Sequence, residues 1–170
     1  MTTRVRAAAA ADRDAIVALV PRLRAFGAAP LRPPEALDRA ERETLERALA
    51  ANAPDAALLV AEVEGLGVAG VAYAHGATDY FTGEPHAHLG ILAVAEAAEG
   101  RGVGRALLEA VDAWARAQGH RYVTLNVFAT NARARAVYER AGYAQDTLRY
   151  YKELAPHAPP APPASDASHG

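Results

Sequence analysis

The sequence lacks cysteine, has a single lysine (Lys152) and contains no long apolar run. Without cysteine the chain has no disulfide framework, thiolate zinc site or cysteine nucleophile, and no metal site is predicted. The 18 Lys and Arg residues against 20 Asp and Glu give a net charge of −2, and the arginines are spread along the chain rather than forming a nucleic-acid-binding stripe. No stretch reaches the roughly 18 consecutive apolar residues of a membrane helix, and the first residues do not read as a signal peptide. The sequence therefore predicts a soluble, cytoplasmic protein that binds neither nucleic acid nor membranes.

What the chain does have is enough apolar sequence for one folded domain. Its 170 residues are 51% hydrophobic, a size and composition that suit a single core. Residues 155–170 contain only Ala, Pro, His, Ser, Gly and one Asp, so they cannot offset the entropy of ordering. We expect a folded domain over residues 1–154 and a disordered tail over 155–170.

Hydrophobic periodicity alternates between the spacing of helices and that of strands. Asp12 is the expected cap of the first helix, and Pro21 should break it. This order predicts the α/β (α+β) class with a mixed sheet flanked by helices. The predicted strands are 4–7, 58–63, 68–75, 86–94, 122–127 and 143–151, and the later helices are 35–51, 102–118 and 132–141.

A glycine-rich turn, EGRGVGRALL over residues 99–108, lies between a predicted strand and an amphipathic helix. It has neither the Lys nor the hydroxyl of a P-loop, and its glycine spacing does not match G-x-G-x-x-G. Free N–H groups at a helix start bind phosphate oxygens, and Arg101 and Arg105 add positive charge. Two interpretations stay open from the turn alone: a diphosphate cradle of the coenzyme A type, or a glycine-rich helix start without a ligand.

A second segment, NARARAVYERAGY over residues 131–143, reads as a helix with Asn131 as its N-cap. Helical spacing puts Tyr138 on the same inward face as Ala134 and Val137. Taken alone, such an inward tyrosine is more often a core residue than an acid.

Together the two segments resemble the GNAT superfamily of acyl-CoA N-acyltransferases. The first family signature, [RQ]-x-x-G-x-[GA], is met at Gly102 and Gly104, and the similarity is strongest from about residue 89 onward. The resemblance implies a mostly antiparallel sheet with splayed central strands, acetyl-CoA (coenzyme A) as cofactor, and acetyl transfer to a primary amine. The second signature, N-x-x-A-x-x-[hydrophobic]-Y-x-x-x-G-[FY], is met by Asn131, Ala134, Val137, Tyr138, Gly142 and Tyr143.

The resemblance also implies a coenzyme site. The strand backbone after residue 91 would pair with the pantetheine arm, and a backbone N–H near Leu92 would polarise the thioester carbonyl. Glu99 departs from the family, which has Arg or Gln there, so we expect it to contribute its backbone and turn its side chain to solvent. The implied coenzyme-binding residues are Leu92, Ala93, Val94, Glu99, Gly100, Arg101, Gly102, Val103, Gly104, Arg105, Ala106, Asn131, Ala134 and Tyr138.

Two proton transfers then need side chains. Tyr138 matches the family's usual donor to the leaving thiolate, where a strong hydrogen bond is expected because phenol (~10) is a weaker acid than thiol (~8.5). Many relatives carry an acidic residue at a position filled here by Gly90 or Ile91. His86 and His88 are the candidate bases instead, since they lie on the right strand and titrate near ~6.5. Ordinary strand histidines, nearby polar side chains or a chain of waters remain alternatives.

The acceptor site is the least defined part of the sequence. Acidic side chains could attract a cationic amine, and aromatic ones could pack on it. A small-molecule or peptide amine both fit, a homodimer is suggested by the family alone, and a non-catalytic acyl-CoA-binding module remains the alternative function. The candidate acceptor-binding residues are Phe26, Asp79, Tyr80, Phe81 and Glu84.

Overall fold

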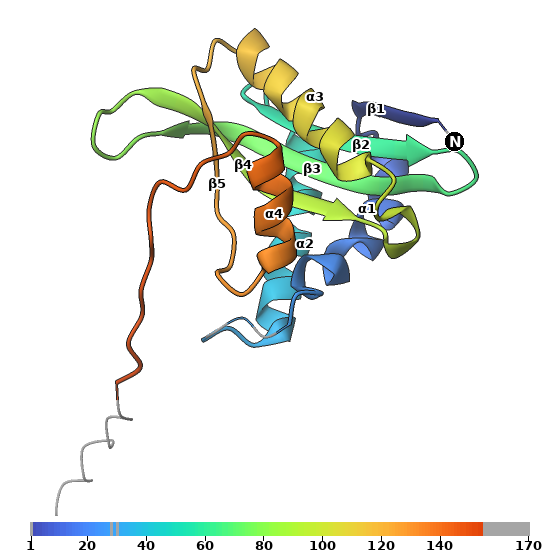
Figure 1. Cartoon of the computed structure of the whole chain (residues 1–170). Helices are drawn as coiled ribbons and strands as arrows, with labels where there is room; N and C mark the ends of the chain where they lie inside the picture. The colour runs from blue at the N-terminus through green and yellow to red at the C-terminus, as the bar shows by residue number, and fades with distance from the viewer. Residues whose placement is uncertain (1, 28, 30, 155–170) are drawn as a thin grey trace, which may run out of the picture.

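The computed structural model describes residues 2–27, 29 and 31–154, so the predicted tail over 155–170 lies outside the described residues. One five-stranded sheet in the order β1-β2-β3-β4-β5 forms the centre of the fold (Figure 1). The first four strands pair antiparallel, and β4 pairs with β5 in parallel, which confirms the predicted mixed, mostly antiparallel sheet. The strands are β1 (Thr3–Ala7), β2 (Ala56–Val63), β3 (Gly67–Thr78), β4 (Pro85–Val94) and β5 (Val123–Leu125).

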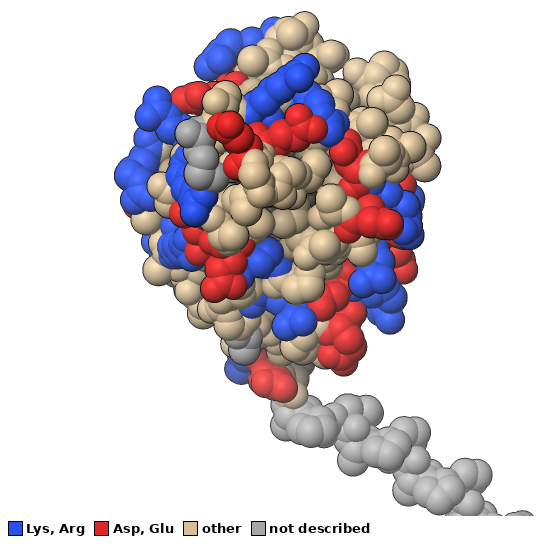
Figure 2. Space-filling view, turned by 90° about the vertical axis from the view of Figure 1, so that its right-hand side faces the viewer, with Lys and Arg blue, Asp and Glu red and all other residues tan. Residues whose placement is uncertain are grey.

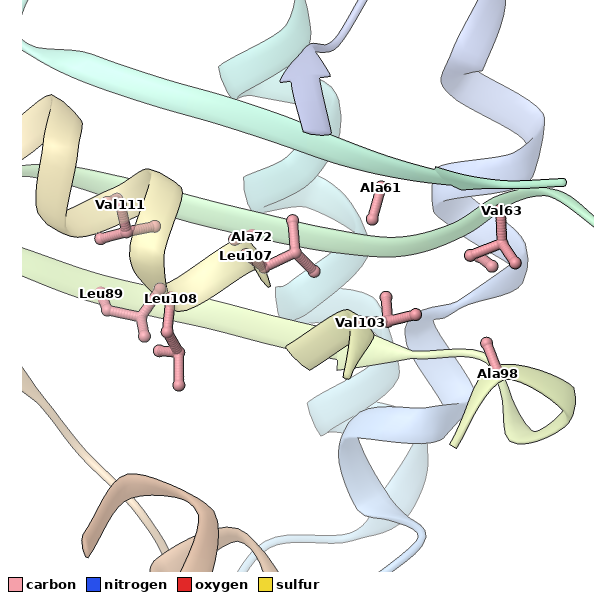
Figure 3. Close-up of a cluster of buried hydrophobic side chains, with 11 residues drawn as sticks. Ala61, Val63, Ala72, Leu89, Ala98, Val103, Leu107, Leu108 and Val111 are labelled. Atoms are coloured by element: carbon pink, nitrogen blue, oxygen red, sulfur yellow. The ribbon is translucent and has the colours of Figure 1, made fainter. Parts of the chain in front are cut away.

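Helices cover both faces of the sheet. On one face α3 packs its apolar stripe onto the central strands, with Leu107 and Val111 fully buried against them (Figure 3). On the other face Ile16 and Leu45, from α1 and α2, bury side chains of β2 and β3. No helix in the described ranges is long and apolar enough to cross a membrane. The helices are α1 (Arg13–Ala18), α2 (Pro34–Ala51), α3 (Val103–Ala117) and α4 (Ala132–Arg140).

A close approach between β3 and α3 fixes where α3 begins. A Cβ atom on Gly70 would lie 2.9 Å from both Leu107 Cδ1 and Val103 Cγ1, so only glycine leaves room for the helix. Gly70 pairs with Val94 at the end of β4. The first turn of α3 is therefore held beside the end of β4.

The N-terminal helix breaks where proline predicted, but Asp12 has a different role from the one expected. The helix α1 ends at Ala18, and a 3₁₀ turn over Val20–Arg24 follows. The Asp12 carboxylate does not cap α1; it accepts bonds of 2.7 and 2.8 Å from Arg6 and one of 2.7 Å from the Ala9 N–H. Charge-assisted bonds to a guanidinium are stronger than a neutral cap, so the ion pair between β1 and the helix start prevails.

The predicted strand over 143–151 is wrong. After α4 the described chain, up to Leu154, contains neither helix nor strand, and in Figure 1 it runs away from the sheet. Leu148 and Tyr150 are 65% and 85% exposed. The alternation of apolar residues is present, but without a sheet surface to bury them the segment gains little from strand formation.

The predicted splay of the central strands is confirmed by the pairing of β4. In the described chain, β4 pairs with β5 at Ala87–Leu89 and then continues alone on that side to Val94. A bulge interrupts the β3 pairing where the strands part, because Tyr73 pairs with Ile91 but Ala74 pairs with Leu89. Gly90 is the extra residue. Residues 90–94 are called the open edge below.

Candidate active site

The open edge offers backbone groups that no strand of the described chain pairs on the β5 side. Leu92 and Val94 pack their half-buried side chains against the buried cluster between α3 and the sheet, which is called the α3 core below. The Val94 carbonyl accepts a 3.3 Å hydrogen bond from Arg22 Nε. In an extended strand, N–H and C=O groups point alternately to the two sides, so part of this edge is free to pair with an extended ligand. The predicted residues Leu92, Ala93 and Val94 all lie on it.

The glycine turn follows the open edge after a short 3₁₀ turn over Glu96–Ala98. Gly100 and Gly102 have φ angles of 71° and 80°, which side chains rarely adopt, and a Cβ on either would point into open space. The next residue, Val103, begins α3, whose first-turn N–H groups lack acceptors within the helix. A Cβ on Gly104 would lie 3.7 Å from Val94 Cγ2, so the helix start borders the end of β4. This uncovered turn fits a diphosphate group.

Glu99 does not turn its side chain to solvent as expected. It is 25% exposed, and its two oxygens bind Arg22 Nη2 at 2.5 Å and Arg133 Nη2 at 2.8 Å. The hydrogen bond from Arg133, together with Arg22, lowers the pKa of Glu99, so the carboxylate stays charged. On the face seen in Figure 2, acidic and basic side chains are likewise interspersed rather than gathered by sign.

The helix α4 brings Tyr138 to the same core as Leu92. Asn131 caps the helix as predicted, its side chain accepting a 3.0 Å bond from the Ala134 N–H. Tyr138 packs against the α3 core, and its ring meets Tyr143 edge-on at 5.8 Å. Burial raises the pKa of Tyr138, so its hydroxyl remains protonated and able to donate at neutral pH.

His88 has a defined hydrogen bond on β5. Its Nδ1 lies 2.8 Å from Thr124 Oγ1, and that hydroxyl in turn is 3.4 Å from the Ala87 carbonyl. When the hydroxyl donates to the carbonyl, His88 Nδ1 must donate to the hydroxyl, which leaves Nε2 with its lone pair. Burial, with the neighbouring His75 and His86, lowers the pKa of His88. This side chain is therefore a neutral base at physiological pH.

His86 is placed quite differently. It is 7% exposed and stacks on Tyr122 with ring centroids 4.9 Å apart. Its Nδ1 is buried and makes no hydrogen bond within the described part of the chain. The period-two spacing of His86 and His88 predicts that both lie on one face of β4. Only His88 is accessible enough to act as a base.

The predicted acceptor-binding residues fall into two separate places. Phe26 stacks on Phe128 at 5.0 Å, joining the loop before α2 to the loop between β5 and α4, and the Arg32 guanidinium lies 5.5 Å from the Phe128 ring. The others lie on the β3–β4 turn, where Tyr80 and Phe81 are 91% and 84% exposed. Phe26 and the residues of the β3–β4 turn were predicted to form one acceptor site, but they lie in different parts of the fold.

The two carboxylates of the β3–β4 turn already have partners. Asp79 accepts bonds of 2.8–3.0 Å from the Phe81 and Thr82 N–H groups and from the Thr82 hydroxyl, and the Thr82 bonds lower its pKa. Glu84 pairs with Arg121 at 3.5 Å. These carboxylates hold the turn in shape.

Three residues of the site were missed from the sequence: Arg22, Thr124 and Arg133. Each acts through a residue distant along the chain, since Arg22 is 77 positions from Glu99 and Thr124 is 36 from His88. Predicting the contact between Thr124 and His88 requires the register of β4 against β5, in which these two residues are paired. No local sequence pattern indicates that register.

Comparison with known proteins places the chain in a family. The model of the acetyltransferase (GNAT) family matches residues 24–143. The chain therefore belongs to the GNAT acetyltransferase family, whose members bind acetyl-CoA, and its activity is acetyl transfer. No curated protein matches the sequence.

Solved structures show the same fold at low sequence identity. A Pyrococcus furiosus protein shares 22% identity over 90% of this chain and 100% of its own, with a TM-score of 0.72. The aminoglycoside N-acetyltransferase AAC(6')-Iy shares 22% over 91% and 99%, with a TM-score of 0.67, and its structure holds a CoA-based bisubstrate analogue. An aminoglycoside acetyltransferase from uncultured soil metagenomic DNA shares 19% over 89% and 96%, with a TM-score of 0.62.

Proposed function

We propose that this chain is an N-acetyltransferase that moves the acetyl group of acetyl-CoA directly to a primary amine. The observation that carries the proposal is the open edge of β4, which is followed after one 3₁₀ turn by the uncovered glycine turn and shares a core with Tyr138. Acetyl-CoA, when bound, supplies the acetyl group as a reactive thioester.

Two parts of the chain would hold the coenzyme. The backbone of Leu92–Val94 pairs with the pantetheine amides as a further strand would. The N–H groups of the turn and the first turn of α3 hold the diphosphate, favoured by the positive end of the helix. Asn131 caps α4 and so fixes the helix that carries Tyr138.

Two donors assist the transfer. The Leu92 N–H polarises the carbonyl that the amine attacks, as oxyanion donors do. The Tyr138 hydroxyl donates a hydrogen bond to the leaving sulfur. Full proton transfer from phenol (~10) to thiolate (~8.5) is uphill by roughly 2 kcal/mol, so the hydrogen bond rather than the transfer is the useful contribution.

His88 supplies the base. An amine with a pKa of ~10.4 is unprotonated on the order of one time in a thousand near pH 7, so a proton has to be removed before attack. His88 Nε2 is the neutral acceptor left by the bond to Thr124. At about 3.3 Å per residue, His88 lies roughly 13 Å from Leu92 along the strand, so the proton travels through water.

The first test is thermal unfolding with and without acetyl-CoA, beside desulfo-CoA and dephospho-CoA. A ligand at a hundred times its Kd adds about 2.7 kcal/mol, which raises Tm by several degrees. No shift at millimolar acetyl-CoA would overturn the proposal. A shift followed by CoA release with a panel of amines supports it, whereas a shift without release from any amine points to the acyl-CoA-binding module.

A further inference from the structure

Glu99 joins the 3₁₀ turn after α1 to the start of α4 through a single carboxylate. Its Oε1 binds Arg22, which lies in the 3₁₀ turn after α1, and its Oε2 binds Arg133, which lies in the first turn of α4. Glu99 itself is the first residue of the glycine turn. Three elements that are far apart in the sequence therefore bring two guanidinium groups to the point where the turn begins.

Arg22 also connects this cluster to the open edge. Its Nε donates to the Val94 carbonyl at 3.3 Å, and its Nη1 lies 3.5 Å from the mostly exposed Glu96. The same side chain thus contacts the last residue of β4 and the first residue of the glycine turn. The Arg22 guanidinium therefore lies between the strand that would hold the pantetheine arm and the turn that would hold the diphosphate.

A carboxylate bound by two guanidinium groups has the chemistry of a phosphate held by arginines: oxygens of an anion accepting charge-assisted hydrogen bonds. Arg22 and Arg133 supply two positive charges at the same place.

We propose that Arg22 and Arg133 bind the diphosphate of coenzyme A, and that Glu99 holds both guanidinium groups at the turn until the diphosphate replaces its carboxylate as their partner. The inference rests on the proposed coenzyme site. Its consequence is a competition between two anions. Glu99 brings one negative charge and a diphosphate brings more, so the exchange favours the coenzyme, but the displaced carboxylate then repels it.

The test compares ligand binding by titration calorimetry. Coenzyme A and dephospho-CoA both carry the diphosphate and should respond alike, whereas pantetheine has the arm without it. We expect Arg133→Gln to weaken coenzyme A binding by about five- to ten-fold, a modest factor because Arg133 is largely exposed. Arg22→Gln should act in the same direction. Neither change should alter the Kd of pantetheine by more than about two-fold. Among the described residues, the hydrogen bond from Arg22 to the Val94 carbonyl is the only one that joins these arginines to the strand, and one such bond contributes little net free energy.

Glu99→Gln gives the opposite sign, which a merely structural role would not. Removing the competing charge should tighten coenzyme A binding by about three-fold or more and leave pantetheine unchanged. Arg140→Gln, the same change in the last turn of α4, is the matched control and should leave both affinities as in the wild type.

The outcomes separate the inference from the proposed function. If the wild type binds coenzyme A but Arg133→Gln and Glu99→Gln do not change its Kd, the inference is wrong and the proposed function stands. Equal weakening of coenzyme A and pantetheine would also overturn it, because the arginines would then only stabilise the fold around the site. If the wild type binds neither ligand, the proposed function fails as well.

Discussion

The two halves of β4 differ in their neighbours, and this difference makes the site. Up to Leu89 the strand lies between β3 and β5, and Leu89 is 3% exposed. After the bulge at Gly90 no strand of the described chain pairs with β4 on its β5 side. The paired half contributes burial and ladder bonds to the fold, while the open half keeps backbone groups for a ligand. A bulge and a three-residue β5 are enough to separate these two tasks.

The largest effect should come from the paired half. Leu89→Ala removes a buried side chain from the α3 core and should lower the free energy of unfolding by about 2–5 kcal/mol, measured by urea denaturation. Leu92→Ala, in the open half, should cost less stability because Leu92 is only half-buried. Equal losses of stability at the two positions would remove the distinction between the halves.

His88 lies where the two halves meet, and its loss should affect chemistry alone. His88→Gln should lower kcat/KM by about a hundred-fold, the usual contribution of a general base. Because the pKa of His88 lies below its usual 6.5, wild-type kcat/KM should rise with pH through a limb below that value. The limb should disappear in the variant.

Two further variants sharpen the interpretation of His88. Thr124→Val should shift the acidic limb while leaving the fold intact, because it removes the hydroxyl that fixes the His88 tautomer. His120→Gln, at the far end of α3, is the matched control and should keep the wild-type profile. An unshifted limb in His88→Gln would assign the base to another group.

The opposite end of the sheet allows stability to be lowered without touching the open edge. The Arg6 guanidinium lowers the pKa of the buried Asp12 from 3.8 to about 2. A carboxyl group whose pKa is lower in the folded than in the unfolded protein stabilises the fold at pH values above the unfolded pKa. Asp12 should therefore contribute about 2 kcal/mol to the free energy of unfolding at neutral pH, and this contribution should be lost as the pH falls from about 4 to about 2.

Asp12→Asn should therefore lower stability at pH 7 by up to about 2 kcal/mol and flatten its acid dependence, with the Kd of acetyl-CoA unchanged. The exposed Asp14→Asn serves as the control, since its side chain is 95% exposed. A changed acetyl-CoA affinity in Asp12→Asn would show that the two ends of the sheet are coupled.

The smallest of these changes concerns Tyr138, which packs against the same core as the open half. Tyr138→Phe should lower kcat by about ten-fold or more, equivalent to about 1.4 kcal/mol, because it removes the hydrogen bond to the leaving sulfur. Acetyl-CoA should still bind, since the ring remains in the core. Single-turnover kinetics would check this, and an unchanged kcat would remove Tyr138 from the mechanism.

Much of the fold could be predicted because its signals are local. The β4 strand and α3 were placed within a few residues, since each has an uninterrupted apolar pattern and α3 begins after a glycine turn. The segment after α4 has the same alternation, yet it stays unpaired because a strand also needs a neighbouring edge and a surface to cover. Sequence pattern alone cannot supply either.

The candidate site divides in the same way. By itself the sequence determined the glycine turn, the Asn131 cap and the inward position of Tyr138, because these depend on residues within one turn or helix of each other. Tertiary structure alone decided that Glu99 binds Arg22 and Arg133, and that Thr124 fixes His88. Those contacts join segments far apart in the chain, and they exist only once packing of the helices and the register of the sheet have brought them together.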